Sequence, residues 1–357
     1  MLLSEGMFNL SRRFVVCEFI NTEKNNRMSD QNQIKPKYWK LQNIGLKSIG
    51  IIIFIVIIIM IDISEAFNLI KSVRKDYIIA AAFLSFVHLF FQALCWRSLI
   101  QIKNSSIWKF IKNFKIFIIG QYFGIVTPGK LGDVVRVFYM KRDLNLKIFE
   151  GLVNIFIHRI INILSLIFIV IVTSYTYLEN HIHYSIVIIA SLAIVITLYL
   201  LSGSASVRTS LKALIEKILG FIMPGRFKHY SATITQELTV FRKAKLVYPS
   251  ILSVIVYLFM ALQSYFILLA MDINISYISL LFFVSIGILS GILPITISGL
   301  GIRELIYIFF FEKIGYGPEV AWSFSMINIA VNYAIISIMG IIFQNKDPIP
   351  IINESKN

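Results

Sequence analysis

The residues best suited to chemistry lie in one segment, QYFGIVTPGKLGDVVR, which runs from Gln121 to Arg136. Pro128 and Gly129 are expected to end a half-helix, because proline cannot continue a helix and glycine accepts a sharp turn. Gly132 would permit close approach of another backbone segment. The spacing therefore predicts a tight turn that carries polar side chains into an otherwise apolar region.

Charged side chains surround this predicted turn. Asp133 would lie near the start of the next helix, where the helix dipole favours a carboxylate. Lys130 and Arg136 add two cations to the same turn. Free backbone N–H groups at a helix start, beside two cations, suit a phosphate group. An ordinary helix–turn–helix at the membrane interface, with its cations extended towards water, explains the same spacing equally well.

Two further pairs of ionisable residues interrupt apolar stretches. His158 and Arg159 lie in one, and Arg303 and Glu304 follow a glycine-rich segment near the end of the chain. Charged groups at membrane depth usually face a partner or a polar cavity. The carboxylates available to Arg159 are Asp133 and Glu304. We expect His158 to be a hydrogen-bonded packing residue, because a lone histidine is a poor metal site.

These residues predict one polar cavity that binds the phosphate of a lipid between two hairpin turns. The expected binding residues are Lys130, Gly132, Asp133, Arg136, Arg159 and Glu304, and the expected turn residues are Pro128, Gly129, Gly299 and Gly301. No catalytic, metal or cofactor site is expected. The two cysteines, Cys17 and Cys95, form no metal-binding pattern, and signatures of nucleophile elbows, phosphate loops and HExxH helices are missing, so we expect no enzyme.

The composition is that of a membrane protein. Of 357 residues, 57% are apolar and 15% are charged, against roughly 45–50% and about 25% in soluble domains. Lys and Arg number 34 and Asp and Glu number 19, a net charge of +15. Because basic residues concentrate in cytoplasmic loops of membrane proteins, this excess predicts a membrane topology and a lipid partner rather than a nucleic-acid partner.

Apolar runs and basic loops together predict an all-α polytopic bundle of about six full spans and two re-entrant hairpins. The spans are 47–63, 77–100, 151–175, 184–201, 249–271 and 320–343. The stretches 107–126 and 275–311 are each interrupted by glycine, proline and charged residues, which predicts hairpins. The order repeats with opposite orientation, as in inverted-repeat transporters. A short internal similarity aligns Thr127, Leu131 and Gly132 with Thr296, Leu300 and Gly301.

The loop charges also predict topology and boundaries. Both termini and the insert 203–247 would be cytoplasmic, and the connections 176–183 and 272–276 external, in a bacterial inner (plasma) membrane. The insert carries an amphipathic helix that would lie on the membrane or bind a partner. The polar segment 1–43, of which 1–27 is either an upstream misread of the start or an unstructured extension, precedes a transmembrane domain of 44–343 and a polar tail of 344–357.

At these motifs the chain resembles the lysylphosphatidylglycerol synthase/flippase transmembrane family. That family has a P-G-x-[LI]-G-[DE]-x-x-R segment, an acid–Arg pair and a G-x-G-x-x-E segment. The matches are Pro128, Gly129, Leu131, Gly132, Asp133 and Arg136, then Arg159 with His158 in place of the acid, then Gly299, Gly301 and Glu304. The resemblance covers about 44–343. It implies lipid handling, and since the chain ends at Asn357, we expect no aminoacyl-transferase domain and no lysyl transfer.

Two functions remain open from the sequence. The first is a flippase-like protein that moves a phosphate-bearing lipid, a phospholipid or a polyprenyl-linked glycan, between leaflets. The second is a non-transporting membrane subunit that holds or regulates a glycosyltransferase or lipid-modifying enzyme. The hairpins and buried charges favour the first. The insert 203–247 and the missing energy-coupling module favour the second.

Overall fold

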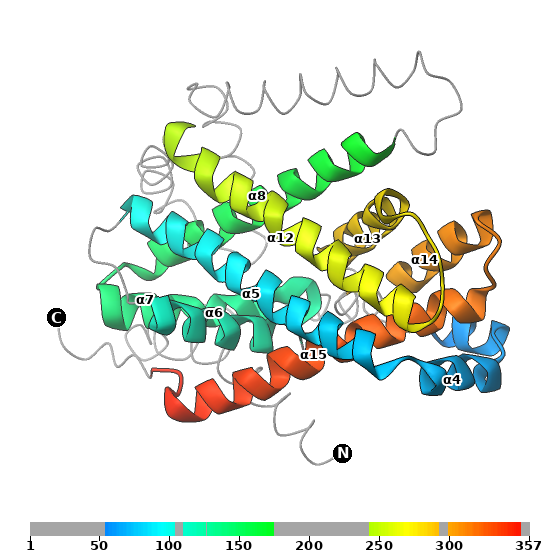
Figure 1. The fold of residues 1–357 in the computed structure, drawn as a ribbon. Coiled ribbons are helices and arrows are strands. Elements are labelled where there is room, and N and C mark those ends of the chain that lie inside the picture. The colour runs from blue at the N-terminus through cyan, green and yellow to red at the C-terminus, as the bar shows by residue number, and fades with distance from the viewer. Residues whose placement is uncertain (1–53, 104–109, 126, 175–242, 293–298, 351–357) are drawn as a thin grey trace, which may run out of the picture. The chain divides into compact units, whose positions relative to one another are not determined.

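The computed structural model describes residues 54–103, 110–125, 127–174, 243–292 and 299–350, and its regular elements there are helices (Figure 1). In chain order they are α4 (Ile63–Ser72), α5 (Lys75–Lys103), α6 (Phe110–Ile125), the 3-10 helix η3 (Pro128–Val134), α7 (Val135–Leu144), α8 (Ile148–Thr173), α12 (Lys243–Ala270), α13 (Tyr277–Ile292), α14 (Ile302–Lys313) and α15 (Pro318–Lys346). The predicted all-α class is confirmed.

Four of the described helices are long and apolar enough to cross a membrane. They are α5, α8, α12 and α15, which makes the chain an integral membrane protein. Of the predicted span 47–63, residues 54–60 are helical. The predicted span 184–201, the connection 176–183, the segment 1–43 and most of the insert 203–247 lie outside the described residues. The total of six spans therefore stays a prediction.

The long helices begin earlier in the chain than the apolar runs that predicted them. The span predicted over 249–271 lies within α12 except for its last residue, and the candidate membrane-crossing part of α12 is Leu246–Ala270; the helix itself begins at Lys243 and holds Pro249 in its interior. Proline lacks the N–H that would bond to the preceding turn. The next residue, Ser250, adds a hydrogen bond in the same turn, because its hydroxyl donates to Leu246 O at 2.8 Å. Hydropathy marks where a helix meets lipid, and this helix starts earlier, among basic residues.

The two interrupted stretches form helical hairpins. The first hairpin consists of α6, η3 and α7, and the second consists of α13 and α14. Helices α6 and α13 have 16 residues each, which is short for a bilayer that needs about 20. Within each hairpin the second arm packs back against the first. This is the interruption that the glycine, proline and charged residues predict.

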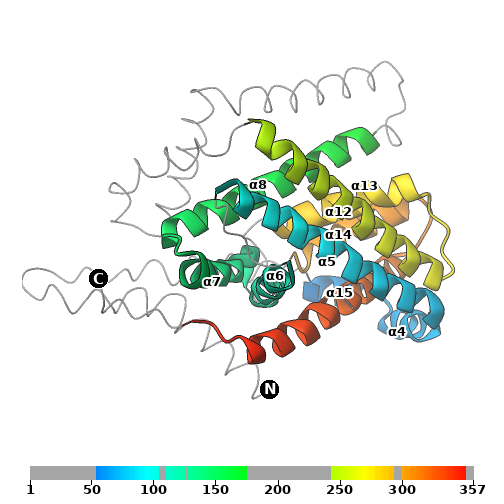
Figure 2. The ribbon, with the colours of Figure 1, turned by 60° about the vertical axis from the view of Figure 1, so that its left-hand side comes forward.

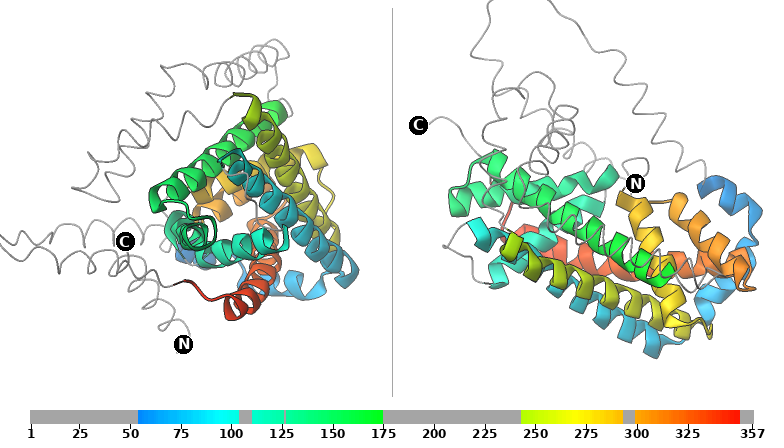
Figure 3. Two further views of the ribbon diagram at one scale, coloured as in Figure 1. Left: turned by 90° about the vertical axis from the view of Figure 1, so that its left-hand side faces the viewer. Right: turned by 90° about the horizontal axis from the view of Figure 1, so that it is seen from above.

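The helices pack with an internal two-fold relation. Exchanging α5, α6, α7 and α8 for α12, α13, α14 and α15 reproduces the contacts. Helix α5 packs along α12, and this is the most extensive helix–helix contact. Helix α6 packs on α15, and its counterpart α13 packs on α8. Helices α5 and α12 run in opposite directions, as do α8 and α15 (Figures 1 to 3). Opposite direction with equivalent contacts is the arrangement of an inverted repeat.

The glycines place this repeat in register. Three of the glycines in the first hairpin have the same spacing as three of those in the second: Gly120, Gly124 and Gly132 match Gly287, Gly291 and Gly299. A Cβ on Gly132 would lie 2.1 Å from Phe123 O and 2.8 Å from Gly124 N, and one on Gly299 would lie 2.9 Å from Gly291 Cα. Gly132 therefore corresponds to Gly299. The predicted alignment of Gly132 with Gly301 is therefore displaced by two positions.

Candidate functional site

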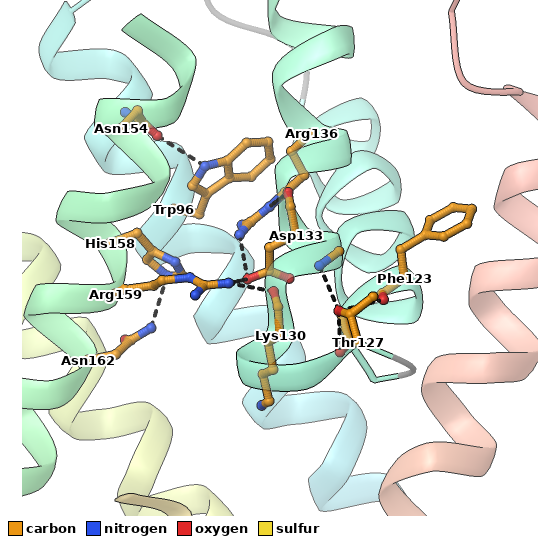
Figure 4. Close-up of polar contacts among 12 residues, drawn as sticks. Trp96, Phe123, Thr127, Lys130, Asp133, Arg136, Asn154, His158, Arg159 and Asn162 are labelled. Atoms are coloured by element: carbon orange, nitrogen blue, oxygen red, sulfur yellow. Dashed lines mark hydrogen bonds and ion pairs between the residues drawn. The ribbon is translucent and has the colours of Figure 1, made fainter. Parts of the chain in front are cut away.

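The turn of the first hairpin is closed by a threonine. Helix α6 ends at Ile125, and the Thr127 hydroxyl accepts a hydrogen bond from Gly132 N at 2.7 Å (Figure 4). The same hydroxyl lies 3.2 Å from Phe123 O, to which it can donate. Because Gly132 has no Cβ, η3 lies directly against the end of α6. Pro128 starts η3, so the predicted turn is a short 3-10 helix.

Asp133 is the centre of a buried ion cluster. Its Oδ2 atom lies 2.9 Å from Arg136 Nη2 and 3.6 Å from Arg159 Nη2. Arg159 also donates to the backbone oxygen of Lys130, which ties α8 to the turn (Figure 4). Asp133 is 4% exposed and Arg136 is fully buried. The structure thus brings three of the predicted binding residues together and gives Arg159 the nearer of its two candidate carboxylates.

Arg136 lies in an aromatic slot. Its guanidinium carbon is 4.9 Å from the centre of the Trp96 ring and 5.2 Å from that of Phe117. A Cβ on Gly120 would lie 2.6 Å from Arg136 Cγ, so the glycine makes the slot. Trp96 Nε1 donates to Asn154 Oδ1 at 3.1 Å. Cations over aromatic faces gain about 0.5–2 kcal/mol. The sequence did not indicate the contact of Trp96 with Arg136, because the two residues are far apart along the chain.

Glu304 forms a separate cluster in the second hairpin. It is fully buried and accepts hydrogen bonds from Gly301 N, from Arg303 Nη2 at 2.9 Å and from Ser325 Oγ at 2.7 Å. The carboxylate therefore caps the start of α14 and pairs with its neighbour. Its hydrogen-bond partners in the described ranges are these three residues, whereas Arg159 lies beside Asp133. The structure does not bring these two predicted site residues together.

A polar cavity of about 120 Å³ lies between the two hairpins. The first hairpin contributes Lys130, and the second contributes Arg303. The other polar groups that line it are His88, Gln92, Gln121, Tyr257, Ser264, Tyr307, Asn328, Asn332 and Tyr333. No carboxylate is among its lining residues, all of which belong to the described ranges. Asp133, Arg136, Arg159 and Glu304 lie outside the lining.

Lys130 is held in an unusual backbone conformation. Its φ angle is 55°, in the left-handed region that residues other than glycine rarely adopt. The side chain extends away from the Asp133 cluster (Figure 4). Its ammonium makes no ion pair with any residue in the described ranges, although it lines the cavity. The turn thus directs into the space between the hairpins a cation that has no counter-ion in the described part of the chain.

Interhelical hydrogen bonds surround the cavity and follow the two-fold relation. Ser85 Oγ on α5 donates to Asn332 Oδ1 on α15 at 3.3 Å, and Ser253 Oγ on α12 donates to Asn162 Oδ1 on α8 at 2.9 Å. His158 lies 3.5 Å from Asn162 and packs edge-on to an aromatic ring. This agrees with the expected packing role of the histidine. The sequence analysis missed the α15 asparagines, Asn328 and Asn332, although polar residues four apart in an apolar span could have indicated them.

An ion network joins the far end of α7 to its neighbours. Asp143 lies 3.0 Å from Lys112 of α6, and Arg142 bridges Asp143 at 2.7 Å and Asp347 at 2.8 Å. Burial raises the pKa of Asp143, but hydrogen bonds from Arg142 and Lys112 outweigh it and hold that pKa below its usual 3.8. The network ties the first hairpin to the end of α15.

Comparison with known protein families shows to which family the chain belongs. The model of the lysylphosphatidylglycerol synthase transmembrane region matches residues 47–340, a range that includes both hairpins and the cavity. The chain belongs to this family. It is similar to three UPF0104 membrane proteins: MJ1595 of Methanocaldococcus jannaschii, 23% identical with 82% of this chain and 91% of the relative covered; MJ1078 of the same organism, 26% identical with 61% and 88% covered; and PH1989 of Pyrococcus horikoshii, 20% identical with 82% and 93% covered. No solved structure matches the chain.

Proposed function

We propose that this protein is a flippase-like membrane protein that binds a phosphate-bearing lipid, a phospholipid or a polyprenyl-linked glycan, and moves it between leaflets. The observation that carries the proposal is the cavity between the hairpins. It is lined by one cation from each hairpin and by neutral polar groups, without a carboxylate. A cavity of this charge inside an apolar bundle fits an anion better than a cation.

Lys130 and Arg303 would contact the phosphate directly. A charged side chain within the bilayer costs at least about 2.5–3.5 kcal/mol on insertion scales. Arg303 offsets this cost through Glu304, whereas Lys130 has no counter-ion among the described residues. A bound phosphate would supply that counter-ion. Amide and hydroxyl groups such as those of Gln121 and Asn328 can complete the hydrogen bonds to its oxygens.

The remaining charged residues would position the hairpins. Asp133, Arg136 and Arg159 hold the first turn against α5 and α8, and Glu304 holds the start of the second. Because each ligand-binding cation is attached to a different hairpin, movement of one hairpin against the other would change which side of the cavity is open. This is the alternating-access logic of inverted-repeat transporters.

The proposal is tested by a leaflet-exposure assay. Purified protein is reconstituted into phosphatidylcholine vesicles that contain a trace of fluorescent phosphatidylglycerol, and dithionite quenches the outer leaflet. We expect nearly complete quenching with wild-type protein and a rate at least tenfold lower with Lys130→Gln. Lys147→Gln, on the exposed link between α7 and α8, is the matched control. Lipid that binds without crossing would instead support the non-transporting subunit.

A further inference from the structure

We infer that the cavity selects lipids with a net-anionic headgroup, a phosphate or diphosphate that carries an uncharged remainder, and that it rejects aminoacylated lipids with a cationic headgroup. This inference rests on the proposed function, because it names the substrate class of the same cavity. It also separates this chain from the lipid in the family's name. Charged groups that line the cavity decide which headgroup it accepts.

The groups that line the cavity carry an excess of positive charge. Among the described lining residues, the formally charged side chains are two cations, Lys130 and Arg303, with no carboxylate, which leaves an excess of two positive charges. Glu304 pairs with Arg303 from outside the lining. The undescribed link 293–298 of the second hairpin has the sequence LPITIS and adds no ionisable side chain.

Neither of the nearby carboxylates, Asp133 and Glu304, lines the cavity where a ligand ammonium would lie. Asp133 lies between two guanidinium groups, and its second oxygen, Oδ1, is buried without a hydrogen-bond partner among the described residues, against the position of Gly124 on α6. Both Glu304 oxygens accept hydrogen bonds from within the protein. The hydrogen-bond acceptors among the side chains that line the cavity are neutral: amide groups, hydroxyl groups and the imidazole ring of His88. These cannot neutralise a charge.

Two classes of headgroup meet this environment differently. A lysyl ester of phosphatidylglycerol carries one phosphodiester and two ammonium groups, so its net charge is positive. Its ammonium groups would enter beside Lys130 and Arg303 and raise the positive excess. A phosphodiester with a glycerol or sugar remainder carries one negative charge, and a diphosphate carries two, which equals the excess of the cavity. The diphosphate class therefore fits most completely, with single phosphates next.

The repeat supports a shared site for this anion. Lys130 lies at the turn of the first hairpin, and Arg303 lies in the first turn of α14, just beyond the turn of the second. Each hairpin therefore presents one cation at its turn to the same cavity. Because the hairpins are related by opposite direction, an anion between them has an equivalent partner towards either leaflet. A cationic headgroup would be repelled by both.

Headgroup selectivity in reconstituted protein tests the inference. Phosphatidylcholine vesicles contain a trace of acyl-labelled phosphatidylglycerol in one preparation and acyl-labelled lysylphosphatidylglycerol in the other. Dithionite quenching gives the rate of crossing, and native mass spectrometry of detergent-purified protein gives the bound lipid. We expect phosphatidylglycerol to gain one charge-assisted hydrogen bond that lysylphosphatidylglycerol loses, which predicts a preference of at least about tenfold for phosphatidylglycerol.

Charge reversal at Lys130 sharpens the test. Lys130→Glu should remove this preference or invert it, a change of at least about tenfold in the ratio of the two rates. Lys130→Asn provides a second variant, because asparagine tolerates the left-handed backbone of this position, and it should reduce the ratio without inverting it. Lys147→Glu, which makes the same charge change at an exposed position, should leave the ratio unchanged.

The outcomes separate the inference from the proposed function. Crossing or binding of lysylphosphatidylglycerol at a rate equal to or above that of phosphatidylglycerol would overturn the inference and leave the flippase proposal standing. An unchanged ratio in folded Lys130→Glu would also overturn it. Failure of wild-type protein to bind or move either lipid would overturn the proposed function and the inference together.

Discussion

Replacing Asp133 by asparagine tests whether the buried cluster holds the first hairpin. Asparagine keeps the size of the side chain but removes the anion that lies 2.9 Å from Arg136 and 3.6 Å from Arg159. Arg136 is fully buried, so it cannot reach water. Removing one partner of a buried ion pair costs about 3–5 kcal/mol. At about 2–4 °C per kcal/mol for a large domain, the unfolding temperature should fall by roughly 6–20 °C.

A second substitution should restore most of that loss. Arg136→Met in the Asp133→Asn background removes the uncompensated cation, and methionine fits between the rings of Trp96 and Phe117. Replacing a whole buried pair is often neutral. The double variant should therefore recover more than half of the stability lost by the single variant, which is the sign of a pair whose role is structural.

The assay is the heating of detergent-purified protein, followed by size-exclusion chromatography of the folded fraction. Asp272→Asn is the control, because Asp272 is 77% exposed and lies 3.9 Å from Arg74, and exposed pairs contribute about 0–1 kcal/mol. The reasoning fails if Asp133→Asn unfolds at the same temperature as the control. It fails equally if the double variant is no more stable than the single one.

Three further outcomes follow from the packing. Gly132→Ala should lower the unfolding temperature by several degrees more than Gly317→Ala, because its Cβ would lie 2.1 Å from a backbone oxygen of α6, whereas Gly317 faces the movable end of a side chain. A double-mutant cycle of Ser253→Ala and Asn162→Leu should give a coupling near 0.6 kcal/mol, and zero coupling would remove this bond from the account. Since its pKa is lowered in the folded state, Asp143 stabilises the protein above about pH 4 and loses this effect as the pH falls through the lowered pKa, so Asp143→Asn should be less stable than wild type at pH 7, and this difference should shrink steadily below about pH 4.

The sequence predicted the helices and hairpins because lipid leaves the backbone few choices. An apolar run that spans the bilayer must satisfy its own hydrogen bonds as a helix, and glycines with charges inside such a run require a protected break. Gly132 was correctly expected to permit close backbone approach, which its position against Phe123 confirms. These features depend on residues close together in the chain.

The partners of the charged residues could not be predicted in the same way. Arg303 and Glu304 are adjacent, yet one lines the cavity and the other is fully buried, because neighbours on a helix point about 100° apart. Which side faces the cavity depends on how the hairpins pack. No sequence motif around Trp96 indicates its contact with Arg136, because that contact depends on the packing of α5 beside the first hairpin.

The central claim is that a lipid phosphate binds between Lys130 and Arg303. Electron cryomicroscopy of the protein in nanodiscs of phosphatidylglycerol tests it most directly, with Lys130→Asn as the comparison. The account predicts headgroup density in the cavity within hydrogen-bond distance of both cations, about 2.7–3.2 Å, and its loss in the variant. Phosphate density at the Asp133 cluster instead, or a wild-type cavity that holds only water, would contradict the account.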